Sequence, residues 1–255
     1  MFVRTSRTGP PLVLLIDDDL VSREVTATVL TLLGYTAHTA ADGAAALAQL
    51  AAAEGQPQPL QPDAILMDAQ MPGLSGTELI AALRAHSQSR IYVVSGSNPP
   101  PEVTAAADGF LLKPFSAETL GRLLEAGEQE SAPSLLDAND TVVSAEVLAQ
   151  FRKLMPEPAV RKVYEAVVAD LGRRIDALDG AIAQGDSAEV RRIGHAIKGG
   201  CGMAGALEAA RLGALLEMGA NQAGDNHLDN RAALLRDLRT AARRLQNMLE
   251  AEMPA

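Results

Sequence analysis

The stretch from 189 to 206 holds one histidine among glycines and basic residues. Read as a helix at about 100° per residue, it places Val190, Ile193 and Ile197 on one apolar stripe and His195 almost opposite. We therefore expect His195 in solvent, sharing its face with Arg191, Arg192, Lys198, Gly199 and Gly202. The two glycines leave room for a large group to approach the His195 ring, and the three cations favour an anionic group. Such an imidazole is a reasonable acceptor for a phosphoryl group.

A second set of reactive residues follows the apolar runs of the first half of the chain. Asp17, Asp18, Asp68, Ser95 and Lys113 each come at the end of such a run. If the runs are parallel strands of one sheet, their carboxyl ends meet at one edge. Three carboxylates there repel one another unless a cation lies among them, and hard oxygen ligands favour Mg²⁺. Lys113 and Ser95 could then bind the oxygens of a phosphoryl group on Asp68.

The elements that position these residues alternate between strand and helix. The apolar runs cover residues 12–16, 35–40, 64–67, 91–94 and 110–112, with segments of helical periodicity between them. Asp19 is expected to cap the first helix, and Ser75 with Glu78 forms a capping-box pattern. Three consecutive prolines limit the fourth helix to about residues 102–107. The pattern predicts an α/β doubly wound, five-stranded parallel sheet.

The second half of the chain has only helical periodicity. Ser144 is expected to cap a short helix, and Asp186 or Ser187 the helix of His195. The other apolar-periodic segments cover residues 160–182, 207–219 and 234–249. They predict an all-α, antiparallel four-helix bundle. The polar, acidic segment before it suits a linker, which predicts domains at 11–126 and 144–255 joined by a linker at 127–143.

Composition and charge exclude some partners. The chain has 255 residues, 47% of them apolar. Residues 1–143 hold 7 Lys and Arg against 17 Asp and Glu, whereas residues 144–255 hold 15 of each. Neither half has the basic footprint of nucleic-acid binding. No apolar run is long enough to insert in a membrane, and the single cysteine, Cys201, fits a buried core position, so we expect a cytoplasmic protein.

The first predicted domain resembles a response-regulator receiver domain, which has a flavodoxin-like fold, over almost all of residues 11–126. The resemblance makes Asp68 the phosphoacceptor and Asp17 with Asp18 the acidic pair. It also implies a metal ligand from the backbone carbonyl of Gln70, and a cis bond before Pro114. The remaining family positions are a hydroxyl switch residue, an aromatic switch residue and a lysine, which fall on Ser95, Phe110 and Lys113. The short, proline-rich fourth helix departs from the family and leaves its output surface open.

The histidine helix resembles the active-site helix of histidine phosphotransfer (HPt) domains. The family pattern His-x-x-Lys-Gly, with a downstream Gly-Ala, matches His195, Lys198, Gly199 and Gly205-Ala206. Gly200 stands where a small polar residue is common, which is a mild departure. HPt domains are four-helix bundles, so the motif and the predicted fold agree.

Together the two resemblances imply a phosphorelay protein that uses Mg²⁺. Asp68 would take a phosphoryl group from a partner sensor histidine kinase, of the hybrid kind, and His195 would exchange one with a partner response-regulator receiver. Lys198, with Arg191 or Arg192, would steady the phosphate, and Gly199 would leave space for the docking receiver. The sequence shows no glycine-rich nucleotide loop after a strand, so the chain is expected to need a separate kinase and not to be an enzyme beyond dephosphorylating itself.

Three alternatives stay open. Phosphorylation of Asp68 could gate access to His195 without transfer between them. The chain could drain phosphate from a kinase as a sink, with hydrolysis at Asp68. A non-signalling binding protein is the weakest alternative, because it leaves two sets of reactive residues unexplained. The sequence leaves the direction of flow, the partners' identities and the oligomeric state open.

Overall fold

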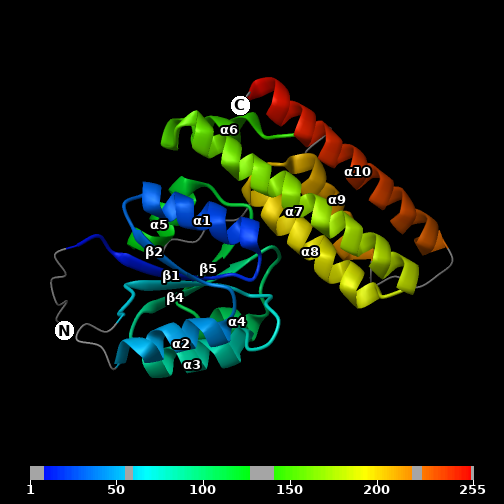
Figure 1. Cartoon of the computed structure of the whole chain (residues 1–255). Coiled ribbons are helices and arrows are strands. Elements are labelled where there is room, and N and C mark those ends of the chain that lie inside the picture. Colours follow the sequence, from blue (N-terminus) through cyan, green and yellow to red (C-terminus); the bar gives the residue numbers. More distant parts are fainter. Residues whose placement is uncertain (1–8, 55–59, 127–140, 220–225, 254–255) are drawn as a thin grey trace. The chain divides into compact units, whose positions relative to one another are not determined.

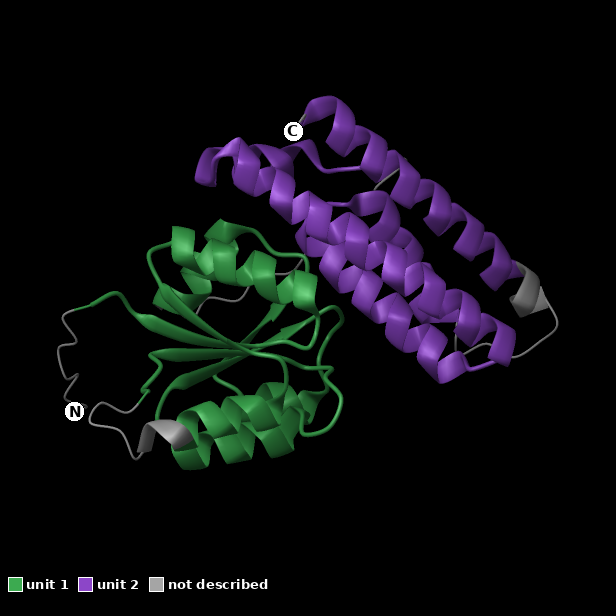
Figure 2. Ribbon diagram, in the orientation of Figure 1, with its two compact units in different colours: residues 1–131 green, residues 132–255 purple. Residues whose placement is uncertain are grey.

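The structure is a computed structural model of the chain and describes residues 9–54, 60–126, 141–219 and 226–253. The chain divides into two compact units, residues 1–131 and 132–255 (Figure 2). Most of the predicted linker, residues 127–140, lies outside the described residues, so the linker stays a prediction.

The first unit is a parallel sheet whose five strands are joined by helices (Figure 1). The strands run in the order β2-β1-β3-β4-β5, every neighbouring pair being parallel, which confirms the predicted doubly wound α/β fold. The strands are β1 (Leu12–Ile16), β2 (Thr36–Ala40), β3 (Ala64–Asp68), β4 (Arg90–Ser95) and β5 (Gly109–Leu112). The helices are α1 (Leu20–Leu32), α2 (Gly43–Glu54), α3 (Gly76–His86), α4 (Pro101–Ala106) and α5 (Ala117–Ala126).

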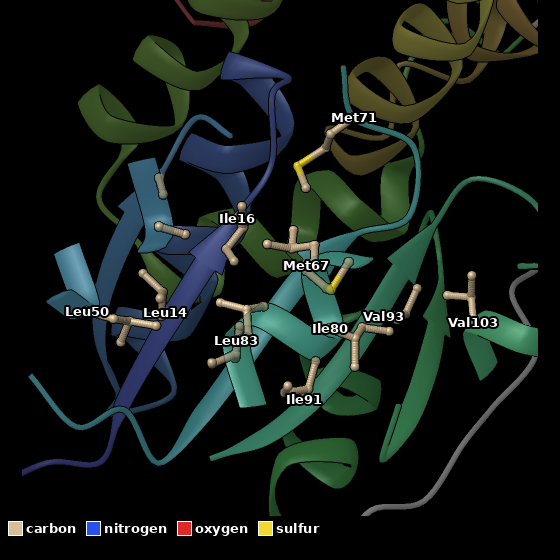
Figure 3. Packing of buried hydrophobic residues seen from close by; sticks show 14 residues of the cluster. Leu14, Ile16, Leu50, Met67, Met71, Ile80, Leu83, Ile91, Val93 and Val103 are labelled. Atoms are coloured by element: carbon tan, nitrogen blue, oxygen red, sulfur yellow. The ribbon is translucent and has the colours of Figure 1, made fainter. Parts of the chain in front are cut away.

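Apolar clusters on both faces of the sheet hold the first unit together. On one face, Ile16, Met67 and Val93 of the three central strands form a cluster with Ile80 and Leu83 of α3 (Figure 3). A second cluster joins alternate residues of the same strands to α1 and α5. Central strands covered on both sides must be apolar throughout, which is why all five side chains of β1 are buried. Reactive groups are therefore confined to the strand ends.

Helix starts in this unit follow the predicted caps in part. The Asp19 side chain accepts a hydrogen bond from the Ser22 amide at 2.7 Å, as a capping residue should. Ser75 occupies the N-cap position of α3, but its side chain makes no capping hydrogen bond, so the predicted capping box is wrong. The short α4 begins at Pro101, one residue earlier than expected, because proline is tolerated in the first turn, where no amide donor is needed.

Over its described residues, the second unit is a bundle of four helices preceded by a short one, as predicted. Ser144 and Asp186 cap α6 and α8 with their side chains. Helix α8 packs against both α7 and α9, and its predicted apolar stripe, Cys201 included, is buried. The helices are α6 (Ala145–Leu154), α7 (Glu157–Gln184), α8 (Ser187–Met203), α9 (Leu207–Gly219) and α10 (Asn226–Glu252). Among the described helices, none has both the length and the apolar composition needed to span a membrane.

Candidate functional site

The carboxyl edge of the sheet brings together two carboxylates and an ammonium group. Asp17 follows β1, Asp68 ends β3 and Lys113 follows β5. The Lys113 Nζ donates hydrogen bonds of 2.7 Å to the Oδ2 atoms of both Asp17 and Asp68. All three side chains are at most 5% exposed. The sheet order thus assembles the predicted cluster from segments far apart in the sequence.

The backbone and neighbouring side chains fix both carboxylates further. Asp17 Oδ2 also accepts a hydrogen bond from the Ser22 hydroxyl at 2.7 Å, and its Oδ1 accepts one from the Asp19 amide at 2.9 Å. Asp68 Oδ1 accepts from the Gln70 amide at 2.8 Å. The carboxylate of Asp17 therefore accepts more hydrogen bonds from the described residues than the carboxylate of Asp68 does.

Charge is unbalanced at this edge. Burial alone would lower the pKa of the Lys113 ammonium, but the carboxylates of Asp17 and Asp68 raise it well above its ordinary value. The pKa of Asp18 is raised, first by burial and then by repulsion from Asp68 and Asp17. One ammonium thus faces three carboxyl groups, and the site favours a further cation.

The donor set fits a hard divalent cation. Asp17, Asp18 and Asp68 each place one carboxylate oxygen within 4.8 Å of those of the other two. Asp18 is exposed, so an ion can reach it from solvent. Oxygen ligands and excess negative charge are what Mg²⁺ requires. The residues therefore fit the predicted Mg²⁺.

The other residues predicted for this edge lie close to it in the fold. Ser95 is the buried last residue of β4, and its Oγ accepts a hydrogen bond from the Ser97 amide at 3.3 Å. Phe110 of β5 is half-buried and packs against the apolar cluster that includes Ile80 of α3. The Gln70 side chain donates to the Ser97 hydroxyl at 3.3 Å, and the Lys113-Pro114 bond is cis.

The second unit holds a histidine, a carboxylate and a lysine on two adjacent helices. The His195 Nδ1 of α8 lies 2.8 Å from Oε1 of Glu217 on α9, and the Lys198 Nζ donates to Oε2 of the same carboxylate at 3.1 Å. The three side chains are 15–17% exposed. The expectation that His195 stands in solvent is therefore wrong, because α9 covers the side of α8 on which it lies.

The Glu217 carboxylate determines which nitrogen of His195 is available. Burial alone would raise the pKa of Glu217, but its hydrogen bond with His195 and the charges of His195 and Lys198 hold the pKa below its ordinary value. An ionised carboxylate only accepts hydrogen bonds, so the Nδ1 of His195 carries the proton. In the neutral form of the ring, the Nε2 is then left with a lone pair and can act as a nucleophile.

The remaining residues predicted around His195 are less involved. Arg191 and Arg192 are exposed, and the Arg192 guanidinium donates to Glu189 on its own helix at 2.6 Å. Gly199 and Gly202 were expected on an open face and are buried instead. The reason is that α8 packs against two other helices, so less of its surface is open than one apolar stripe predicts.

Family comparisons give the two units their identity. Residues 13–125 match the family model of the response regulator receiver domain, and residues 162–252 match that of the Hpt domain. The chain is a receiver domain followed by an Hpt domain. This combination belongs to phosphorelay signalling, and both domains are phosphotransfer modules.

Individual relatives match parts of the chain. The sensor histidine kinase AruS of Pseudomonas aeruginosa is 30% identical over 199 residues, which are 74% of this chain and 19% of the kinase. The response regulator MprA of Mycobacterium ulcerans is 31% identical over 59% of this chain and 62% of that protein. The chain thus spans less than two thirds of either relative. The solved structure of the chemotaxis protein CheY4 of Vibrio cholerae matches 46% of this chain and 98% of its own, with 31% identity and a TM-score of 0.39.

Two residues of the sites were missed in the sequence. Glu217 lies 22 residues from His195, in a helix whose apolar spacing marks only its core face. Ser22 lies in the first turn of α1. It was missed because Asp19 already accounted for the polar residues at the start of this helix. In the sequence, the only sign of the side chain that contacts His195 was a glutamate in the last helical turn before Gly219. Its local sequence did not distinguish it from an exposed, solvated charge.

Proposed function

We propose that the receiver, residues 11–126, accepts a phosphoryl group on Asp68 from the phosphohistidine of a separate sensor kinase of the hybrid type. The Hpt domain, residues 144–255, exchanges a phosphoryl group between His195 and the aspartate of a partner receiver. Both reactions take place in the cytoplasm. The residues between the two domains serve as a linker.

Transfer to Asp68 is a displacement at phosphorus. A carboxylate oxygen of Asp68 forms a bond to the phosphorus, the bond from phosphorus to the donor nitrogen breaks, and the donor imidazole keeps the electron pair. Lys113 reduces the negative charge on Asp68 and can turn to the incoming phosphoryl oxygens. Ser95 supplies a hydroxyl to the same oxygens. Phe110 acts as the aromatic switch residue that responds to phosphorylation of Asp68. When bound, Mg²⁺ supplies the further neutralisation that the three carboxylates need, with Asp18, Asp68 and the Gln70 carbonyl as its ligands and Asp17 close by.

Transfer to His195 uses its Nε2. This nitrogen forms a bond to the phosphorus of an aspartyl phosphate, the bond from phosphorus to the carboxyl oxygen breaks, and a carboxylate leaves. Positive charge develops on the ring, and the Glu217 carboxylate at Nδ1 stabilises it. Lys198 adds a positive charge near the phosphate, and Arg191 and Arg192 contribute at longer range.

One observation carries this proposal: Asp68 and His195 each contact a charged side chain of their own unit. Lys113 contacts Asp68 in the receiver, and Glu217 contacts His195 in the Hpt domain.

The test is to map phosphate on the full chain after incubation with Mg²⁺ and a small acyl-phosphate donor. We expect wild type to carry phosphate on Asp68, and Asp68→Asn to lose it completely. His195→Gln should leave Asp68 labelled. Peptide mapping by mass spectrometry locates the label, with the exposed residues His38 and Glu125 as His38→Gln and Glu125→Gln controls. A label that survives on the receiver of Asp68→Asn would contradict the assignment.

The same experiment separates relay, gating and sink. Label on His195 that depends on Asp68 supports exchange between the two sites of one chain. Label confined to Asp68 supports separate partners or gating. Rapid loss of phosphate from Asp68, followed over time, supports a sink.

A further inference from the structure

Helices α8 and α9 touch backbone to backbone at two glycines. A Cβ atom built on Gly194 would lie 2.8 Å from the Glu217 amide nitrogen and 2.9 Å from the Gly213 carbonyl oxygen. A Cβ atom on Gly213 would lie 2.7 Å from the Lys198 amide nitrogen and 2.8 Å from the Gly194 carbonyl oxygen. Ordinary contact begins at 3.4 Å, so no side chain fits at either position. Only glycine permits this separation of the helices.

The contact is reciprocal and involves the residues of the Hpt site. Gly194 lies four residues before Lys198 on α8, and Gly213 lies four residues before Glu217 on α9. Each glycine therefore faces the backbone of the site residue on the other helix. Gly194 also directly precedes His195. The two glycines thus fix the separation of the helices at the level where Glu217 reaches His195 and Lys198.

We infer that Gly194 and Gly213 are positioning residues for phosphotransfer at His195, acting through Glu217. This inference rests on the proposed role of His195. Glycine inside a helix is less favourable than alanine, so two facing glycines weaken the helices that they join. Their close contact brings the Glu217 carboxylate into hydrogen-bonding distance of two side chains at once.

The geometry leaves little tolerance. A Cβ at Gly213 would have to retreat by about 0.7 Å to reach ordinary contact, and because it meets backbone, α9 would have to move with it. Hydrogen bonds of 2.8 and 3.1 Å, lengthened by that amount, would be weakened or lost. The imidazole would lose the partner that fixes its tautomer. Misplacement of about 1 Å at a reacting group can slow a reaction up to about a hundredfold.

The test measures phosphorylation of His195 in the full chain with a small phosphoramidate donor. Asp68→Asn in every variant leaves His195 as the only proposed acceptor. Gly194→Ala and Gly213→Ala should each slow labelling by at least about tenfold. Gly172→Ala and Gly180→Ala are matched controls, because an added Cβ meets nothing within 4 Å at either helix α7 position, and they should label at the parent rate. Glycine variants that fold and label at the parent rate would overturn the inference.

Two further readouts separate positioning from mere packing. In the parent, ¹⁵N NMR should show the proton of His195 on Nδ1, and in the glycine variants a mixture of tautomers. In a Glu217→Gln background, Gly213→Ala should change the rate by less than about twofold, because the contact through which it acts is already altered. An undiminished tenfold effect there would mean that Gly213 acts otherwise, and would overturn the inference.

A final variant covers glycine substitutions that fail to fold, as judged by circular dichroism. Glu217→Asp withdraws the carboxylate by one methylene without touching the helix contact, and should slow labelling as Gly213→Ala does. A parent rate in Glu217→Asp would show that the helix separation does not matter, and would overturn the inference. If the parent itself is never labelled on His195, the proposed function fails, while the NMR comparison still tests the geometry.

Discussion

The two proposed acceptor sites differ in how far apart in the sequence their residues lie. In the receiver, Lys113 lies 96 residues from Asp17 and 45 from Asp68. In the Hpt domain, Glu217 lies 22 residues from His195, on the next helix. A sheet edge collects the first site from several strand ends, whereas one helix pair forms the second.

The two sites also differ in the charge of the group that would accept phosphate. An aspartate acceptor is already negative, so the receiver surrounds it with an ammonium group and a place for a divalent cation. An imidazole reacts as an acceptor through a lone pair that carries no net negative charge, so the Hpt domain needs no cation cluster and instead holds one ring nitrogen with a carboxylate. Neutralisation matters most in the first site and orientation in the second.

Removing divalent cations should affect only the receiver, and this is the largest difference expected. With a chelator present, labelling of Asp68 by an acyl-phosphate donor should fall more than about a hundredfold, because three carboxylates are left with one ammonium. Labelling of His195 by a phosphoramidate should not change. Both are measured by intact mass, and added Mg²⁺ should restore the first. Equal sensitivity of the two sites would break the contrast.

Lys113→Ala should lower the rate of Asp68 labelling by about a hundredfold and leave His195 labelling unchanged. Its ammonium is the one described side-chain cation bonded to Asp68. Lys162→Ala, an exposed lysine of the Hpt domain, is the control. Circular dichroism checks the fold, since Asp17 also loses a buried partner. An unchanged rate in a folded Lys113→Ala would remove this lysine from the mechanism.

Lys198→Ala should slow labelling of His195 by about tenfold and leave Asp68 unaffected. The effect is smaller than at Lys113 because Lys198 is partly exposed and its charge is screened by water. The exposed Lys153 supplies the Lys153→Ala control, and quench-flow labelling gives the rates. A loss as large as that of Lys113→Ala would mean that neutralisation dominates in both sites.

The smallest effect is on stability. Because the pKa of Glu217 is lowered on folding, its ionised form stabilises the Hpt domain above the ordinary carboxyl pKa of 4.5, and this contribution disappears as pH falls through the lowered value. Urea unfolding should therefore show wild type more stable than Glu217→Gln by about 1 kcal/mol at pH 7, with the difference vanishing near pH 3. A difference that persists at about pH 3 would exclude an ionic origin.

Much of the receiver could be predicted because its signals are local. Apolar runs such as Leu12–Ile16 must be buried on both faces, and an aspartate or lysine directly after such a run can only lie at the strand end. The parallel strand order then predicts that Asp17, Asp68 and Lys113 lie together. No side-chain distances are needed for this prediction. The places of Asp18 and Ser95 near this edge follow from the same argument.

The sequence by itself determined the two fold classes, the acidic edge of the sheet and the helix that carries His195. Only the tertiary structure decided that His195 is largely covered, that Glu217 binds both His195 and Lys198, and that Asp17 is held mainly by the protein. Strand ends meet wherever the sheet order brings them, so burial patterns suffice there. The separation and rotation of two helices depend instead on contacts such as that of Gly194 with Gly213, which no spacing within one helix reveals.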